Sequence, residues 1–177
     1  MVNVGKRFSA IWRLVAFLAA FACSTIQLPA QVVAGSYFPP LNAIGLSGGK
    51  VPDTKGRVVI VDFWASWCAP CKASFPVYSR LQEAYAARGL TIVAVSVDDN
   101  PSAYRTFVDK LRPAFAALYD QKKSLVGLVQ VPTMPTSYLL DRRGIVRFVH
   151  PGFHGIQTER EVRKEIEDLL DEKTGIQ

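Results

Sequence analysis

The sequence predicts an α/β fold in which a mixed central sheet carries helices on both faces. Two runs rich in β-branched residues, 57–63 and 90–97, have the composition of buried strands, and segments with helical periodicity alternate with them. Two further strand-like runs, 136–140 and 145–149, flank a turn at 141–144 and predict a closing hairpin. Because alternating strands and helices favour parallel pairing while a hairpin is antiparallel, the sheet is expected to be mixed.

The chain of 177 residues, 49% of them hydrophobic, is long enough for one domain with a proper core plus extra segments. Its three cysteines are too few for a disulfide scaffold. The formal net charge of +6 includes Lys6, Arg7 and Arg13, and residues 1–30 carry no acidic residue, so the remainder carries +3. No basic cluster with interleaved aromatics occurs, and we expect no nucleic-acid partner.

Residues 1–34 are predicted to be a signal peptide or N-terminal anchor, because basic residues precede an apolar run at 14–23. This run is shorter than the roughly 20 residues that a membrane span needs. A cleaved signal, an uncleaved membrane tether and a lipid attached to Cys23 are the alternatives. In each case we expect the folded part in the periplasm or at the extracytoplasmic face of the inner membrane.

Residues 35–56 are predicted to be a linker and lead-in that proline and glycine punctuate, with a disordered spacer first and an edge hairpin later. The folded domain is expected to span 57–172 and to leave 173–177 as a tail. The lead-in residues expected to cover one side of this domain are Tyr37, Phe38 and Leu41.

The first predicted helix covers 70–88, where Gly89 is a natural C-terminal stop and Pro76 is expected to kink the helix. A second helix, 102–111, begins after Asn100 as N-cap and a proline in its first turn. Its aromatic residues recur at helical spacing, and we interpret them as core.

A short strand at 115–119 and a short helix at 123–129 are predicted before the hairpin. The last predicted helix, 158–170, presents an apolar stripe to the sheet. Thr158 and Glu161 stand at the spacing of a capping box, and we expect them to start this helix.

The motif CAPC at 68–71 follows the first buried strand and opens the first helix. Two cysteines at this spacing after a strand are typical of a redox site, since one helical turn brings the sulfurs close enough for a disulfide. The first sulfur then lies at the helix N-terminus, where unpaired N–H groups favour the thiolate. A structural disulfide is one alternative. A zinc site would need four ligands, and outside this pair the chain offers only Cys23, His150 and His154, at no recognisable spacing.

The segment VDFWASWCAPCK resembles the active site of the thioredoxin superfamily, and FWASWCAPCKASFP is similar to its TlpA-type extracytoplasmic branch. The resemblance extends from Lys50 to Leu170. It implies a thioredoxin-like fold with an extra βα insertion near 91–118, and the activity of a thiol–disulfide oxidoreductase.

Cys68 is predicted to be the attacking nucleophile, because it precedes the helix and is expected to be exposed, whereas Cys71 should be covered one turn inside. Cys68 would form a mixed disulfide with the substrate, and Cys71 would then displace the substrate and leave a Cys68–Cys71 disulfide. Strongly oxidising members of the family carry a histidine just before the second cysteine. This chain has Pro70 there, so the resemblance favours reduction of partners.

Asp62 stands six residues before the first cysteine, and thioredoxin carries a buried carboxylate at this offset that helps to deprotonate the second cysteine. Burial raises a carboxyl pKa and makes such a group a suitable base for a buried thiol near neutral pH. An aspartate turned outward at the strand end is the alternative. TlpA-type proteins often carry a glutamate three residues after the second cysteine, where this chain has Ser74.

The family places a cis-proline opposite the cysteines, and Pro135, followed by threonine, fits its pattern whereas Pro132 does not. A cis bond would leave the backbone of Met134 free to hydrogen-bond an extended substrate. An ordinary trans proline at the strand entry is the alternative. Trp67, beside the first cysteine, is expected to shield the site and to contact partners.

We therefore predict an exported reductase of protein disulfides that uses no cofactor and no metal. The resemblance implies partners such as apocytochrome c or a copper-site assembly protein of an oxidase, and a membrane electron donor of the thiol-reductase type. A copper-binding chaperone that uses both cysteines and a histidine is one alternative, and a disulfide-forming oxidase is another. His150 and His154 are assigned no catalytic role.

Overall fold

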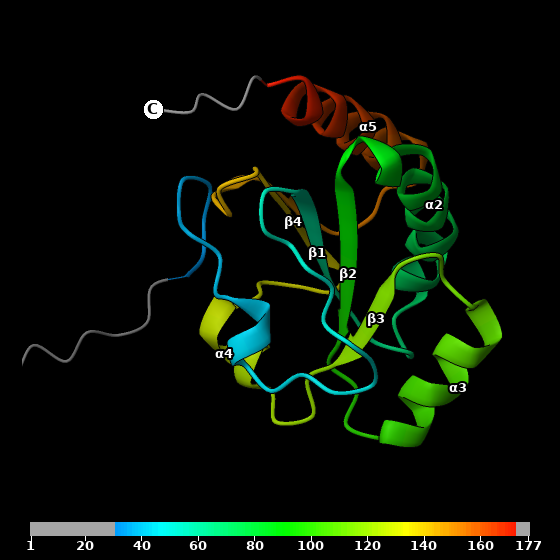
Figure 1. Cartoon of the computed structure of the whole chain (residues 1–177). Coiled ribbons are helices and arrows are strands. Elements are labelled where there is room, and N and C mark those ends of the chain that lie inside the picture. Colours follow the sequence, from blue (N-terminus) through cyan, green and yellow to red (C-terminus); the bar gives the residue numbers. More distant parts are fainter. Residues whose placement is uncertain (1–30, 173–177) are drawn as a thin grey trace, which may run out of the picture.

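A five-stranded mixed sheet forms the centre of the computed structural model, which describes residues 31–172 (Figure 1). The strands are β1 (Val58–Trp64), β2 (Leu90–Ser96), β3 (Ala116–Tyr119), β4 (Thr136–Leu140) and β5 (Val146–Pro151). The strand order is β3-β2-β1-β4-β5. The pairs β1–β2 and β2–β3 are parallel, whereas β1–β4 and β4–β5 are antiparallel. The predicted fold class is confirmed.

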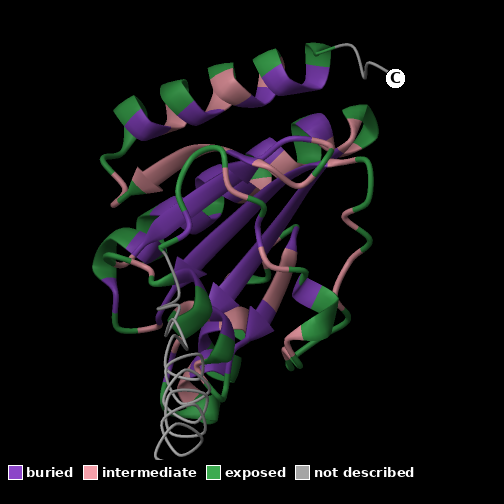
Figure 2. Cartoon of the chain, turned by 90° about the vertical axis from the view of Figure 1, so that its left-hand side faces the viewer, coloured by how far each residue is buried: buried purple, intermediate pink, exposed green. Residues whose placement is uncertain are grey.

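Helices cover both faces of the sheet. They are α2 (Ala69–Tyr85), α3 (Pro101–Leu111), α4 (Ser124–Val129) and α5 (Ile156–Asp171), with short 3-10 helices at η3 (Leu41–Ala43) and η4 (Ala86–Arg88). In Figure 1, α2 and α5 lie on one side of the sheet and α4 lies on the other. Figure 2 shows the central strands buried and α5 buried only along the side that faces the sheet.

The central strand β1 is buried along its whole length and divides the core in two. Val58, Ile60 and Trp64 pack in one apolar cluster with α2, α3 and α5, whereas the alternate residues pack in a second cluster with α4. Trp64 lies against three further rings, with centroid distances of 4.8 Å to Phe75, 6.1 Å to Tyr104 and 4.4 Å to Phe107. Such aromatic pairs add about 0.5–1.5 kcal/mol each beyond the burial of their area.

The lead-in before β1 packs on the domain, and the expectation of a disordered spacer followed by a hairpin is wrong. Val32, Phe38 and Leu41 are buried in the second cluster, while single bridges join Tyr37 to Ile145 and Ser47 to Tyr119. Helix α4, which contributes Leu125 and Val129 to this cluster, is only six residues long, so the lead-in supplies further apolar cover. Tyr37 does not take part, since it is 72% exposed.

The first helical region ends as predicted, with α2 passing into η4 and with Gly89 in the left-handed conformation at φ 109°. The helix continues past Pro76 without a break. The N-cap of α3 is also confirmed, because the Asn100 side chain accepts a hydrogen bond from the Ser102 N–H at 2.8 Å.

The predicted capping box of the last helix is wrong. Helix α5 begins at Ile156, two residues earlier than expected, with Gly155 as its N-cap at φ 64°. Glycine reaches this backbone conformation without steric cost, so the chain can turn into the helix there. The Thr158 hydroxyl instead accepts from the backbone N–H of His154 at 3.0 Å, on the preceding loop.

The predicted tail and most of the predicted signal or anchor lie outside the described residues. Within 31–172, every helix is too short or too polar to cross a membrane.

Candidate active site

The two cysteines occupy the junction between the end of β1 and the start of α2. Cys68 is the N-cap of α2, and its sulfur accepts a hydrogen bond from the Cys71 backbone N–H at 3.3 Å. The two residues form a disulfide with an S–S distance of 2.05 Å. The sulfur of Cys68 therefore receives both a direct N–H donor and the positive end of the helix dipole, which together favour a thiolate after reduction.

Both cysteines are more buried than an exposed nucleophile would be. Cys71 is 0% exposed, as predicted, but Cys68 is only 5% exposed, so the expectation that Cys68 is exposed is wrong. The reason is that Cys68 packs in the same apolar cluster as Trp64 and Cys71. Trp67, in contrast, is 67% exposed directly beside the disulfide.

The register of the sheet brings the proline loop to the cysteine end of β1. Thr136 pairs with Phe63 near the end of β1, so the preceding Pro135 lies at the edge of the sheet from which the cysteine loop leaves. The Met134–Pro135 peptide bond is cis, which confirms the prediction that Pro135 is the cis-proline. The backbone of Met134 makes no hydrogen bond within the described part of the chain. The Gly152 N–H holds the loop by donating to the Pro135 carbonyl at 2.7 Å.

Asp62 points from β1 toward α2, on the face of the sheet where the cysteines pack. It alternates with Ile60 and Trp64, which share an apolar cluster with Cys71. The side chain is 0% exposed, so the alternative of an outward-facing aspartate is wrong. Burial raises the pKa of Asp62 to about 7, although a hydrogen bond from Ser137 partly offsets this.

Two hydroxyl groups that sequence reasoning missed accompany this carboxylate. Ser137 Oγ donates to Asp62 Oδ1 at 2.7 Å and lies 2.6 Å from the Tyr78 hydroxyl. Asp62 Oδ2, in contrast, has no hydrogen-bond partner among residues 31–172. Signals were present in the sequence. Tyr78 follows Cys71 by seven residues, or two helical turns, so both lie on one face of the helix. Ser137 is a polar residue in β4, a strand that is buried along its whole length.

A second buried carboxylate, Asp98, fixes the loop that leads to the first cysteine. It accepts from the backbone N–H of Ser66 at 3.1 Å and from the Ser66 hydroxyl at 2.7 Å. A third donor, the hydroxyl of Ser96, lies 2.8 Å away. Sequence reasoning placed Asp98 only as a strand terminator, because its partner Ser66 is 32 residues away in the chain.

Ser74 occupies the position at which TlpA-type proteins often carry a glutamate. It is 0% exposed, and its hydroxyl donates to the Cys71 carbonyl at 2.9 Å. Its hydroxyl therefore makes a hydrogen bond within α2, and the buried carboxylate on the face of β1 where the cysteines pack is that of Asp62.

The two histidines have partners on or next to the last helix, since the His154 backbone N–H donates to the Thr158 hydroxyl. His150 Nε2 lies 2.6 Å from a carboxylate oxygen of Glu165 on α5. Among residues 31–172, no group of three or more histidine, cysteine, aspartate or glutamate residues is arranged to hold a metal ion.

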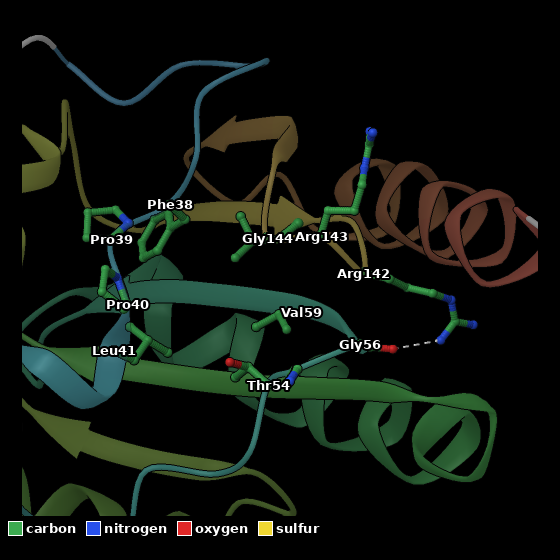
Figure 3. Close-up of a pocket in the computed structure, with 12 residues that line it drawn as sticks. Phe38, Pro39, Pro40, Leu41, Thr54, Gly56, Val59, Arg142, Arg143 and Gly144 are labelled. Atoms are coloured by element: carbon green, nitrogen blue, oxygen red, sulfur yellow. Dashed lines mark hydrogen bonds between the residues drawn. The ribbon is translucent and has the colours of Figure 1, made fainter. Parts of the chain in front are cut away.

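A cavity of about 240 Å³ lies at the end of the sheet opposite to the cysteines (Figure 3). It is lined by Phe38, Leu41 and Val59, near the start of β1, and Arg142 beside it donates to the Gly56 carbonyl at 3.1 Å. Because the cysteines follow the other end of β1, this cavity is not part of the redox site.

A thioredoxin-like fold with a Cys-X-X-Cys disulfide at the first helix after the central strand defines a thiol–disulfide oxidoreductase. The chain belongs to the AhpC/TSA family, whose family model matches residues 35–149.

The chain is similar to other proteins over most of the domain. The thioredoxin-like protein YneN of Bacillus subtilis is 34% identical over 142 residues, which are 77% of this chain and 78% of that protein. The thiol-disulfide oxidoreductase ResA of Bacillus anthracis is 32% identical over 114 residues, 63% of this chain and 66% of that protein. A solved structure described as a thiol:disulfide interchange protein DsbE from Chlorobium tepidum is 33% identical, with a TM-score of 0.72, and the match covers 79% of this chain and 99% of that one.

Proposed function

We propose that this thiol–disulfide oxidoreductase reduces disulfides in extracytoplasmic partner proteins, with Cys68 as the attacking residue. One observation carries the proposal: the Cys68 sulfur caps α2 and accepts the Cys71 N–H, while Cys71 is fully buried one turn inside. The two sulfurs therefore differ in environment, and the N-terminal one has the conditions that stabilise a thiolate.

The reaction starts from the dithiol form. The Cys68 thiolate attacks one sulfur of the substrate disulfide, which forms a mixed disulfide and releases the other substrate sulfur as a thiolate. Cys71 loses its proton and attacks Cys68, and the second substrate sulfur leaves as a thiolate. Two electrons have then passed to the substrate, and the Cys68–Cys71 disulfide must be reduced again by a membrane electron donor of the thiol-reductase type.

Asp62 is proposed as the base that takes the Cys71 proton. Its pKa of about 7 suits proton transfer near neutral pH, and it lies on the sheet face against which Cys71 packs. Asp62→Asn should therefore slow release of the substrate from the mixed disulfide and leave the first attack by Cys68 unchanged. Stopped-flow measurement of both phases checks this, and equal release rates in the two proteins would remove Asp62 from the mechanism.

The substrate segment is proposed to lie between Trp67 and the proline loop. Trp67 offers an exposed apolar ring, and the unpaired backbone groups of Met134 beside Pro135 can hydrogen-bond an extended chain. Such backbone bonds are independent of substrate sequence, so they suit an enzyme with more than one protein partner.

The direction of the reaction and the partners follow from the resemblance to the TlpA-type branch. Pro70 stands where oxidising members carry histidine, which favours reduction. Apocytochrome c and a copper-site assembly protein of an oxidase are the proposed partners, with residues 1–34 as signal or membrane tether. A reduction potential nearer to about −270 mV, as in thioredoxin, than to about −120 mV, as in DsbA, supports a reductase, and a value at the oxidising end would make the protein a disulfide-forming oxidase.

Trapping tests the order of the two cysteines. In Cys71→Ser, the mixed disulfide on Cys68 cannot be resolved, so partner proteins should accumulate as complexes that a reducing agent dissolves. Cys68→Ser, the matched control, should trap little. The reverse pattern would assign the attack to Cys71.

A further inference from the structure

Three buried side chains from three elements form one hydrogen-bonded chain beneath the active site. Asp62 of β1, Ser137 of β4 and Tyr78 of α2 are each at most 3% exposed. Ser137 Oγ is the middle member, 2.7 Å from Asp62 Oδ1 and 2.6 Å from the Tyr78 hydroxyl. Tyr78 and Ser137 are called here the hydroxyl pair.

The two hydrogen bonds that join Tyr78, Ser137 and Asp62 run in one direction when Asp62 is ionised. A carboxylate only accepts hydrogen bonds, so Ser137 donates to Asp62. Because a serine hydroxyl has a single proton, Tyr78 must donate to Ser137. Burial, together with the nearby charges of Asp62 and Glu165, raises the pKa of Tyr78, so Tyr78 keeps the proton that it donates.

The same two hydrogen bonds decide which oxygen of Asp62 receives a proton. If Oδ1 were protonated and donated to Ser137, one proton of the hydroxyl pair, that of Tyr78 or that of Ser137, would be left without an acceptor within the described residues. Leaving a buried donor unpaired is costly. Oδ2 has no hydrogen-bond partner in the described part of the protein, so a proton placed there leaves the hydrogen bonds between Asp62, Ser137 and Tyr78 intact.

Other titratable groups face the hydroxyl pair from the neighbouring elements. Glu165 of α5 acts electrostatically on Tyr78, and it is itself paired with His150 of β5 at 2.6 Å. His150 lies opposite Ser137 in the β4–β5 register. On the other side of β1, the residue opposite Asp62 is Ala94 of β2, which carries no charge.

We propose that the hydroxyl pair consists of positioning residues that occupy Oδ1 of Asp62 and leave Oδ2 free to take the Cys71 proton. This inference rests on the proposed role of Asp62 as the base for Cys71. The hydrogen bond from Ser137 also stabilises the carboxylate against the effect of burial, so that enough of it is ionised to act near neutral pH.

The direct test is a carbon-13 NMR titration of the Asp62 carboxyl group in the oxidised protein. Ser137→Ala should raise the inflection by about one pH unit or more, because a hydrogen bond to the charged form is lost. Tyr78→Phe should raise it by less, since Ser137 still donates but is no longer polarised by Tyr78. Tyr138→Phe is the matched control: it deletes a buried hydroxyl on the other face of β4 that has no partner within residues 31–172, and the inflection should not move.

The kinetic readout is the pH profile of substrate release from the mixed disulfide. Asp62 is about half ionised at pH 7 in the wild type, and a rise of one unit leaves about a tenth ionised, so Ser137→Ala should be about fivefold slower at that pH. Its rate should recover at alkaline pH, which a merely structural defect would not produce.

Two results would refute the proposed positioning role of the hydroxyl pair. One is an unchanged inflection in Ser137→Ala. The other is a lowered inflection in Tyr78→Phe, because Ser137 would then have been donating to Tyr78 and not to Asp62. Unshifted inflections combined with slow substrate release in Asp62→Asn would refute the role of the hydroxyl pair and leave Asp62 as the proposed base. Shifted inflections combined with wild-type release in Asp62→Asn would overturn the proposed base, and with it the catalytic use of the pair.

Discussion

Replacing Asp62 by asparagine is expected to remove a pH-dependent loss of stability. The folded-state pKa of Asp62, raised by burial to about 7, lies above its ordinary value of 3.8. Between these values the folded protein keeps a proton that the unfolded chain has released, so the free energy of unfolding falls as the pH rises through this range. Asparagine does not titrate, and its variant lacks this contribution.

The magnitude follows from the gap between the two pKa values. A gap of about three units corresponds to about 4 kcal/mol between acidic pH and pH values above 7, at about 1.4 kcal/mol for each unit. About 3 kcal/mol of this loss falls between pH 5 and pH 8. Because Asp62 is fully buried, solvent does not screen the effect.

Urea unfolding of the oxidised protein at pH 5 and pH 8 measures the effect in both proteins. The loss of stability between the two pH values should be larger in the wild type than in Asp62→Asn by about 3 kcal/mol. Other titrating groups contribute equally to both proteins and cancel, as does any constant cost of fitting the amide. Equal losses in wild type and variant would show that Asp62 titrates normally, and the reasoning from its burial would fail.

Three further changes have definite expected outcomes. Trp67→Ala should raise KM for a protein substrate while it changes stability by less than about 0.5 kcal/mol, because the ring is 67% exposed; reduction of a small disulfide serves as the control. Pro70→His should make the cysteine couple more oxidising, measured by equilibration with glutathione, and an unchanged potential would contradict the assignment of direction. Asn100→Ala should cost about 1 kcal/mol of unfolding free energy through loss of the α3 cap, with no change in turnover.

Local chemistry made much of this protein predictable from its sequence. Buried strands, the cysteine motif and the cap at Asn100 depend on neighbouring residues, so composition and spacing located them. The failures occurred where a neighbouring glycine or a long-range contact outweighs the pattern on which the prediction was based. Thr158 has the pattern of a capping box, but the backbone freedom of Gly155 lets α5 start earlier. Tyr37 and Phe38 are neighbouring aromatic residues, yet only Phe38 packs in the second cluster.

The candidate active site shows the same division between residues that the sequence predicts and residues that it misses. Sequence identified the cysteines, Asp62 and Pro135 as candidates, because a motif and its offsets are one-dimensional. It did not identify Tyr78, whose hydroxyl meets Ser137 across 59 residues of chain. Nor did it foresee that Cys68 would be nearly as buried as Cys71.

The sequence by itself therefore determined the strands and helices, the redox pair and the class of chemistry, since these follow from periodicity and from residues close together in the chain. Only the tertiary structure decided which oxygen of Asp62 is occupied and which is free. The physical reason is that this depends on hydroxyl groups brought from β4 and α2 by the register of the sheet and the packing of the helix, and neither distance is encoded in any local stretch.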